Sequence, residues 1–235
     1  MSQAIVVLSP HAFEARAAAG VGQAMHREPW GAWMLYRGRL WDHPFAVIRT
    51  GPGKAATAAA VQAAIQYLDP GLVMAFGVAG CSDPSMEVGA LVAADLVVDV
   101  ALAELSDLPA RIDDRWRPDA DLVAALREIP GTRSRPVVCW EGHVVSPVHR
   151  PRLRAPVDGP IVADWESAAL ASVCSSWQVP WGVLKVVSDH GEPDRLKRVA
   201  VVARRPLQWG AEVMRRACSG WMAAHGGPAG GPDVG

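Results

Sequence analysis

The chain has 235 residues, of which half are hydrophobic, with 23 basic and 24 acidic side chains. This length suits one large hydrophobic core, and the balanced charge creates no overall field that would attract nucleic acid or an anionic membrane. No apolar run approaches the roughly twenty residues that span a bilayer. We therefore predict one domain over residues 1–225, followed by a disordered Gly/Pro-rich tail over 226–235, and a small-molecule partner.

The N-terminus runs directly into an apolar segment and lacks the basic region and cleavage site of a signal peptide, which favours a cytoplasmic location. Neither the cysteines nor the histidines show metal-ligand or redox spacing. We expect buried reduced thiols, no metal and no cofactor. The widely separated cysteines are Cys81, Cys139, Cys174 and Cys218.

Short β-branched runs alternate with alanine-rich stretches along the chain. The runs at 4–8, 45–50, 72–77, 90–100, 136–141, 161–164 and 181–187 are predicted to be strands. The stretches at 54–67, 119–127, 167–177 and 207–224 have the apolar spacing of helices. This alternation indicates a three-layer α/β/α fold around a central sheet that is mostly parallel but mixed.

Two proline-containing stretches, 106–118 and 147–160, are predicted to be loops. The second carries Arg150, Arg152 and Arg154 and follows His143. Such a loop either borders a functional site or is a solvated surface, and the sequence leaves both readings open.

Polar or small residues follow several predicted strands where these strands end. In open α/β sheets ligands bind beyond the carboxyl ends of the strands, so we expect these residues to converge on one site. A single acid in such a position also fits the first turn of a helix or the cap of a turn, and only the joint placement favours a site. The residues are Glu14, a glycine-flanked turn with Val78, Ala79 and Gly80, then Trp165 and Glu166, and finally Ser188 and Asp189.

Four segments make the sequence resemble the nucleoside phosphorylase and nucleosidase superfamily, and within it the methylthioadenosine/S-adenosylhomocysteine nucleosidases. These are the Gly51-Pro-Gly-Lys turn, residues 76–89, Asp164-Trp-Glu-Ser, and a strand ending in Ser188-Asp189. The resemblance implies a nucleoside phosphorylase-like fold, a homo-oligomer, and cleavage of the bond between purine and ribose in a 5′-substituted adenosine. Some members use water and others phosphate.

Residue by residue, the resemblance implies that Glu14 activates water, Glu166 binds the ribose hydroxyls and Asp189 protonates the departing purine. Cleavage passes through an oxocarbenium-like sugar, which needs a base on one face and an acid beside the leaving group. The resemblance also implies that the remaining converging residues line the substrate pocket. These are Trp165, Ser188, Val78, Ala79 and Gly80.

Hydrolysis is favoured over phosphorolysis because Glu14 is present, whereas the Gly-Asp-Pro-type phosphate loop of the phosphorylases is not. Arg49 keeps phosphate open as a second partner. The Gly51-Pro-Gly53 segment has the wrong spacing for a Walker-type loop and is predicted to be a tight turn before a helix.

Two departures leave alternatives open, since Trp165 stands where the family has Met and Val78 where the nucleosidases have Ser. The Asp95-Leu-Val-Val-Asp99 and 13–16 segments resemble the hopanoid-associated phosphorylase branch, which implies release of adenine from an adenosylated hopanoid lipid precursor. Futalosine-type hydrolysis is a further alternative within the superfamily. A catalytically weak nucleoside-binding protein is an alternative of another class.

Overall fold

The computed structural model describes residues 3–100, 114–141, 157, 161–191 and 199–225. Most of the two predicted loops lies outside these residues, as does the C-terminal tail. His143, Arg150, Arg152 and Arg154 also lie outside them.

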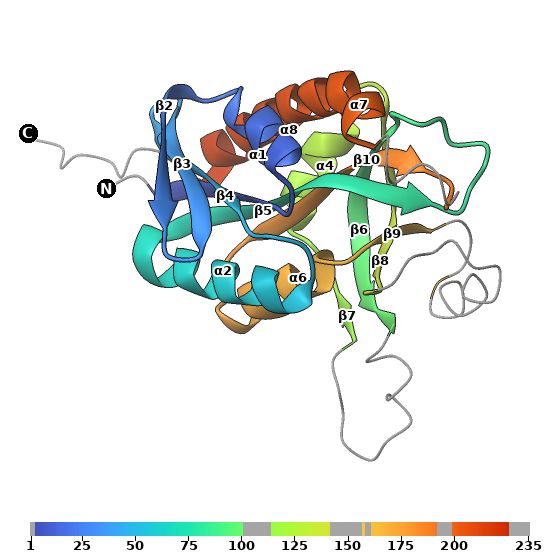
Figure 1. Ribbon diagram of the computed structural model, residues 1–235, viewed down its shortest axis with the longest axis horizontal. Coiled ribbons are helices and arrows are strands. Elements are labelled where there is room, and N and C mark those ends of the chain that lie inside the picture. Colours follow the sequence, from blue (N-terminus) through green and yellow to red (C-terminus); the bar gives the residue numbers. More distant parts are fainter. Residues whose placement is uncertain (1–2, 101–113, 142–156, 158–160, 192–198, 226–235) are drawn as a thin grey trace, which may run out of the picture.

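A ten-stranded mixed sheet forms the centre of the molecule (Figure 1). The strand order is β10-β6-β8-β9-β5-β1-β4-β3-β2, with β7 attached to β6 and a further pairing between β10 and β5. Five of the strands therefore close into a ring, namely β5, β9, β8, β6 and β10. Strands β1, β4, β3 and β2 extend from β5 as an open sheet. The strands are β1 (Ala4–Ser9), β2 (Gln23–Trp30), β3 (Trp33–Leu40), β4 (His43–Arg49), β5 (Pro70–Cys81), β6 (Leu91–Asp99), β7 (Arg115–Trp116), β8 (Thr132–Cys139), β9 (Val162–Asp164) and β10 (Trp181–Asp189).

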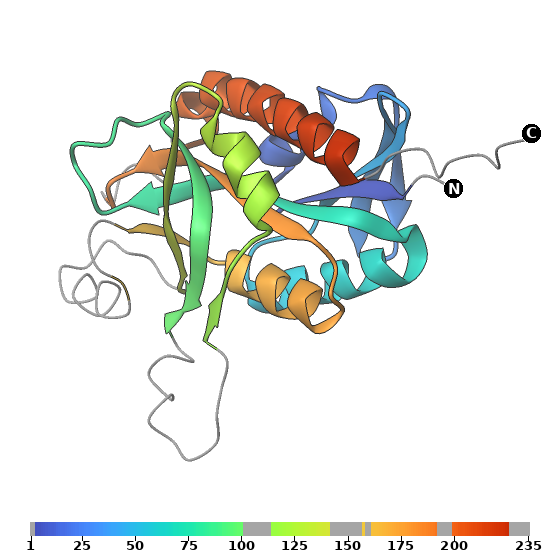
Figure 2. The ribbon, with the colours of Figure 1, turned by 180° about the vertical axis from the view of Figure 1, so that it is seen from behind.

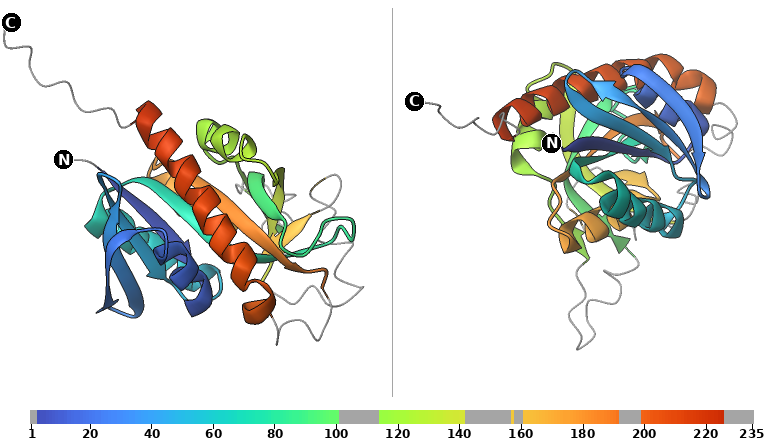
Figure 3. Two further views of the ribbon diagram at one scale, coloured as in Figure 1. Left: turned by 90° about the horizontal axis from the view of Figure 1, so that it is seen from above. Right: turned by 90° about the vertical axis from the view of Figure 1, so that its left-hand side faces the viewer.

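Helices cover both faces of the sheet, as Figures 1 and 2 show. One face carries α1 (Ala12–Ala19), α4 (Ala120–Arg127) and α8 (Arg204–His225), and Figure 3 shows α8 crossing over it. The other face carries α2 (Lys54–Leu68) and α6 (Ser167–Ser176), while the short α7 (Val199–Val202) precedes α8. The predicted three-layer α/β fold with a mixed sheet is confirmed.

The alternation of side chains along β1 explains why both faces are covered. Ile5 and Val7 pack in the cluster that includes α1 and α8, whereas Val6 and Leu8 pack in the cluster that includes α2 and α6. Because successive side chains of a strand point to opposite faces, an apolar run without alternation needs a helix layer on each side.

The predicted turn at residues 77–80 is wrong, because β5 continues through Cys81. Backbone pairing extends this strand, since residues 77–80 lie beside β10 and Gly80 also pairs with Ala163 of β9. The glycines of this segment therefore serve close packing and not a change of chain direction.

The hairpin of β2 and β3 was not predicted from the sequence. Its first strand contains His26, Arg27, Glu28 and Pro29 and is mostly exposed or half buried. It lies at the end of the sheet and pairs on one side only, where a charged and proline-containing strand is tolerated. Cross-strand pairing with β3, and not burial, defines this element.

Candidate active site

The predicted site residues lie on or directly after β1, β5, β9 and β10. Strands β1 and β10 both pair with β5 in parallel, whereas β9 pairs with it in antiparallel orientation. Strand β9 is only three residues long, and its Ala163 lies opposite Gly80 of β5. Because β9 is so short, Glu166, two residues after its end, stays near the end of β5 although the two strands are antiparallel.

Glu14 is completely buried and is held by two backbone donors from different elements. The backbone N–H of His11 donates to its Oε2 over 2.7 Å, and the N–H of Val78 donates to its Oε1 over 2.8 Å. A Cβ at Gly77 would lie 2.6 Å from Oε1, so only glycine allows the carboxylate to approach β5. Glu14 thus both caps α1 and reaches into the sheet.

A buried cation lies next to the second carboxylate. Nζ of Lys185 is 2.7 Å from Oδ2 of Asp164 and 3.9 Å from Oε2 of Glu166. Asp164 also accepts from the backbone N–H and the hydroxyl of Ser167 at the start of α6. Oε1 of Glu166 accepts from the backbone N–H of Gly53 over 3.0 Å, which ties it to the start of α2.

Lys185 and Asp164 were not predicted as site residues. Lys185 is 1% exposed in the middle of β10, at a position where both neighbours are apolar valine and leucine residues. Such a charge inside an apolar strand needs a buried partner. A lysine inside this apolar strand was therefore the signal in the sequence from which a buried ion pair could have been predicted.

Burial raises the pKa of Glu14 to about 7, against the lowering effects of the Val78 hydrogen bond and of Lys185. Burial likewise raises the pKa of Glu166 to about 7, and Lys185 is the strongest opposing influence. For Lys185, burial alone would lower the pKa, but Asp164 and Glu166 raise it above its usual range. Two carboxyl groups that titrate near neutral pH thus lie beside a permanent cation.

Asp189 lies in a second group of predicted residues, where β10 meets the end of β5. Its Oδ2 accepts from the hydroxyl of Ser188 over 2.6 Å, and its Oδ1 accepts from the backbone N–H of Gly191 over 2.8 Å. The hydroxyl of Ser188 is also 3.1 Å from the carbonyl oxygen of Ala79. Asp189 pairs with Gly80, where a Cβ would lie 3.4 Å from Oδ1.

A small cavity adjoins Asp189. It encloses only about 10 Å³, room for about one water molecule, and backbone and small side chains make up much of its wall. Its lining residues are Gly80, Cys81, Ser82, Ile161, Ala163, His190 and Gly191.

The two remaining predicted residues are half buried. Trp165 lies between Asp164 and Glu166, both of which contact Lys185. Val78 contributes its backbone N–H to Glu14. Because that contact comes from the main chain, the replacement of Ser by Val at this position leaves it intact.

The Gly51-Pro-Gly53 segment is the tight turn that was predicted, since both glycines have positive φ (83° and 95°) and α2 begins at Lys54. The backbone N–H groups of Gly53 and Lys54 donate to Glu166 and Glu141, respectively. Two amides that a phosphate loop would use are therefore occupied by carboxylates of the chain itself.

Within the described ranges, no group of three or more His, Cys, Asp and Glu side chains is arranged to hold a metal ion. None of the helices in those ranges combines the length and the apolar character needed to cross a membrane.

Comparison with known proteins identifies the family. The model of the phosphorylase superfamily matches residues 3–216, and the chain belongs to this superfamily. A 5′-methylthioadenosine/S-adenosylhomocysteine nucleosidase of Tolumonas auensis is 28% identical over 166 residues, which cover 66% of this chain and 72% of the relative. The corresponding nucleosidase of Staphylococcus saprophyticus is 22% identical over 175 residues, covering 68% and 75%.

Solved structures share the fold at lower identity. Futalosine hydrolase of Helicobacter pylori superposes with a TM-score of 0.84 at 18% identity and covers 94% of this chain and 99% of its own. The S-adenosylhomocysteine nucleosidase of Streptococcus pyogenes, in complex with 5-methylthiotubericidin, gives a TM-score of 0.83 at 16% identity, with 93% and 97% covered. These matches support the nucleoside phosphorylase-like fold expected from the sequence.

Proposed function

We propose that this protein is an enzyme that cleaves the N-glycosidic bond of a 5′-substituted adenosine with water and releases the base. The observation that carries this proposal is the pair of buried carboxyl groups, Glu14 and Glu166, whose pKa values are raised to about 7 beside Lys185. Strongly perturbed acids gathered around one point are characteristic of catalytic sites. The nucleosidase relatives support the choice of substrate class.

In the proposed reaction, the bond between C1′ and the purine nitrogen breaks while water attacks C1′. Glu14 takes a proton from the water, and Asp189 supplies a proton to the imidazole ring of the purine. The products are the neutral base and a ribose that carries the new hydroxyl group. Each proton transfer supplies a factor of about a hundred to ten thousand.

Glu166 is proposed to bind the ribose hydroxyl groups, with Trp165 against the sugar. Its position supports this role, because Gly53 fixes one carboxylate oxygen and Lys185 lies 3.9 Å from the other. A carboxylate held from two sides keeps its orientation when a hydroxyl group binds. The base is proposed to lie beside Asp189, near Ala79, Gly80 and Ser188, at the end of β10 where the hydroxyl of Ser188 lies 3.1 Å from the carbonyl oxygen of Ala79.

Water is the proposed nucleophile because the N–H groups at the start of α2 already bind Glu166 and Glu141. Arg49, the last residue of β4, is half buried and is the residue to examine if phosphate participates. Rates measured with and without phosphate distinguish the two nucleophiles, as does the sugar product, which is the 5′-substituted ribose with water and its 1-phosphate with phosphate.

The test is release of the purine base from methylthioadenosine, S-adenosylhomocysteine, futalosine-type and adenosyl-lipid substrates, comparing wild type with Asp189→Asn. Release that collapses in the variant supports the proposed reaction. Release from the lipid substrate alone would favour the hopanoid alternative. Purine binding without release from any substrate would favour a nucleoside-binding protein.

Association into a homo-oligomer, which the family resemblance implies, and a cytoplasmic location remain proposals. Light scattering on the purified chain measures the first, and fractionation of cells that express it measures the second.

A further inference from the structure

Glu14 is shut off from solvent, so a proton that it takes up cannot leave it directly. Its side chain is completely buried, and both carboxylate oxygens accept from backbone N–H groups, those of His11 and Val78. In the proposed reaction Glu14 gains a proton from the attacking water in every cycle, and Asp189 loses one to the purine. Before the next cycle, the proton on Glu14 must reach solvent through another group of the chain.

The buried charged groups beside Glu14 do not provide this exit. Lys185 forms a buried ion pair with Asp164, which keeps the lysine protonated. Glu166 is buried as well, and its carboxylate is held by the N–H of Gly53 and lies 3.9 Å from Lys185. None of these three side chains is exposed, so a proton passed to one of them would remain inside the protein.

His11, the residue directly before α1, connects this buried cluster to the surface. It is exposed, and its backbone N–H lies 2.7 Å from Oε2 of Glu14. The two residues form a capping box, in which the side chain of each is turned toward the backbone N–H of the other. The imidazole is thus held beside the turn of α1 that carries the Glu14 carboxyl group.

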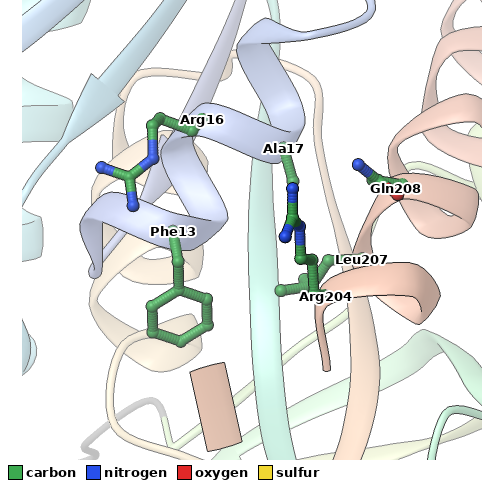
Figure 4. A pocket seen from close by; sticks show the side chains of 6 residues that line it. All are labelled: Phe13, Arg16, Ala17, Arg204, Leu207 and Gln208. Atoms are coloured by element: carbon green, nitrogen blue, oxygen red, sulfur yellow. The ribbon is translucent and has the colours of Figure 1, made fainter. Parts of the chain in front are cut away.

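Stacking on Phe13 fixes the plane of the His11 ring. The two rings are nearly parallel, with centroids 5.6 Å apart and an angle of 6° between their planes. Phe13 in turn lines a surface groove of about 460 Å³ between α1 and α8, which Figure 4 shows. The stacked pair therefore extends from the turn that carries Glu14 to the outside of the protein.

The imidazole of His11 is in the state that accepts a proton. Burial lowers the pKa of His11 from its usual value of 6.5, an effect that Glu166 opposes and Lys185 strengthens. His11 is therefore neutral at pH 7, and a neutral imidazole has one ring nitrogen that accepts. Glu14, whose pKa is about 7, gives up its proton in the same pH range.

We propose that the imidazole of His11 carries the proton of Glu14 to solvent after each cleavage. This inference rests on the proposed function, in which Glu14 is the base. The proton leaves Oε2 of Glu14, binds a ring nitrogen of His11 and passes from the imidazolium to bulk water, while Asp189 regains a proton from solvent. Transfer of this kind runs directly or through one water molecule. His11 acts through Glu14 and not on the sugar.

The experiment measures adenine release from methylthioadenosine by His11→Asn, in the first turnover and at steady state. Asparagine keeps the helix cap and the backbone N–H at this position, but its amide does not take up a proton at neutral pH. We expect a burst of about one adenine per active site at the wild-type rate, followed by a steady state about a hundredfold slower. Because proton release follows cleavage, kcat/KM should stay unchanged. Imidazole added to the buffer should restore the steady-state rate.

His26→Asn is the matched control, because it removes an exposed imidazole from β2 at the edge of the sheet. This variant should show neither a burst nor a response to imidazole. Slow release by His11→Asn already in the first turnover would overturn the inference, as would a slow steady state that imidazole does not restore. Steady-state release at the wild-type rate would overturn it too.

A pH jump separates failure of this inference from failure of the proposed function. If wild type cleaves no nucleoside, the proposed function fails, but the exit of the proton from Glu14 can still be followed. After a jump from about pH 5 to about pH 9, the infrared band of the protonated Glu14 carboxyl group, assigned with Glu14→Gln, should decay faster in wild type than in His11→Asn. Equal decay in the two proteins would overturn the inference.

Discussion

Nζ of Lys185 lies 2.7 Å from Oδ2 of Asp164, and both side chains are 1% exposed. A fully buried ion pair of this kind contributes little net stability, because the cost of removing two charges from water offsets their attraction. Lys185 lies among apolar side chains of β10, since Val183 and Val187 point to the same face of the sheet as Lys185. The contact of Lys185 with Glu166 gives the pair a function in the proposed site, namely to set the charge of the neighbouring carboxylates.

Lys185→Met should shift the acid limb of the pH profile, which is the rise of kcat/KM with increasing pH, to higher pH. Glu14 must be ionised to accept a proton, so activity rises with pH through its pKa of about 7. Lys185 lowers the pKa of both Glu14 and Glu166, and its removal raises both values further. Kinetics from pH 5 to about pH 9 measure the limb.

The double variant Lys185→Met with Asp164→Asn is the control for this shift. Removing Lys185 alone leaves Asp164 buried without its ion-pair partner and should cost about 3–5 kcal/mol of stability. Because Asp164 raises the pKa of both carboxyl groups, its neutralisation should move the limb back toward wild type. An acid limb unchanged in a folded Lys185→Met variant would contradict the proposed electrostatic role.

The stability of the protein should also depend on the raised pKa of Glu14. A carboxyl group whose pKa rises from 4.5 to about 7 on folding contributes stability that is complete below pH 4.5 and lost as pH rises toward 7. The unfolding free energies of wild type and Glu14→Gln should be measured in urea at pH 5 and pH 8. Between these pH values wild type should lose stability relative to the variant. A change of roughly 1–3 kcal/mol is expected, and a constant difference would exclude the raised pKa.

The buried strands and helices could be predicted from the sequence because their apolar patterns reflect local burial. The run that became β1 and the alanine-rich α2 are examples. Elements that depend on long-range pairing could not be predicted in this way. Examples are the charged β2 and residues 77–80, which continue β5 because β9 and β10 pair with them. The carboxylates are candidates because of their position after strands, whereas the contact between Lys185 and Asp164 joins residues from β10 and β9 that no local pattern connects.

Asp189→Asn should reduce adenine release by about a hundredfold to ten-thousandfold, because a purine departs poorly without a proton on its ring. The loss should depend on the leaving group. With p-nitrophenyl ribofuranoside, whose leaving group departs without protonation, the variant should retain most of the wild-type rate. Equal losses on both substrates would indicate that Asp189 maintains the structure of the end of β10 and does not act as the acid.

Gly77→Ala should abolish activity by displacing Glu14. The new Cβ would lie 2.6 Å from Oε1 and 2.9 Å from Cδ of Glu14, so the carboxylate must leave the Val78 N–H. We expect activity to fall by more than about a hundredfold, with a loss of about 1–3 kcal/mol in stability from the forced repacking.

Gly220→Ala provides the means to separate these two effects. Nothing lies within 4 Å of a Cβ at this exposed position of α8, so alanine should stabilise the helix by about 0.5–1 kcal/mol and leave the kinetics unchanged. Added to Gly77→Ala, it should recover part of the stability measured in urea. If activity returns with that stability, the loss came from unfolding; if activity stays low in the restabilised protein, the displaced Glu14 carboxylate is the cause, as the proposed mechanism requires.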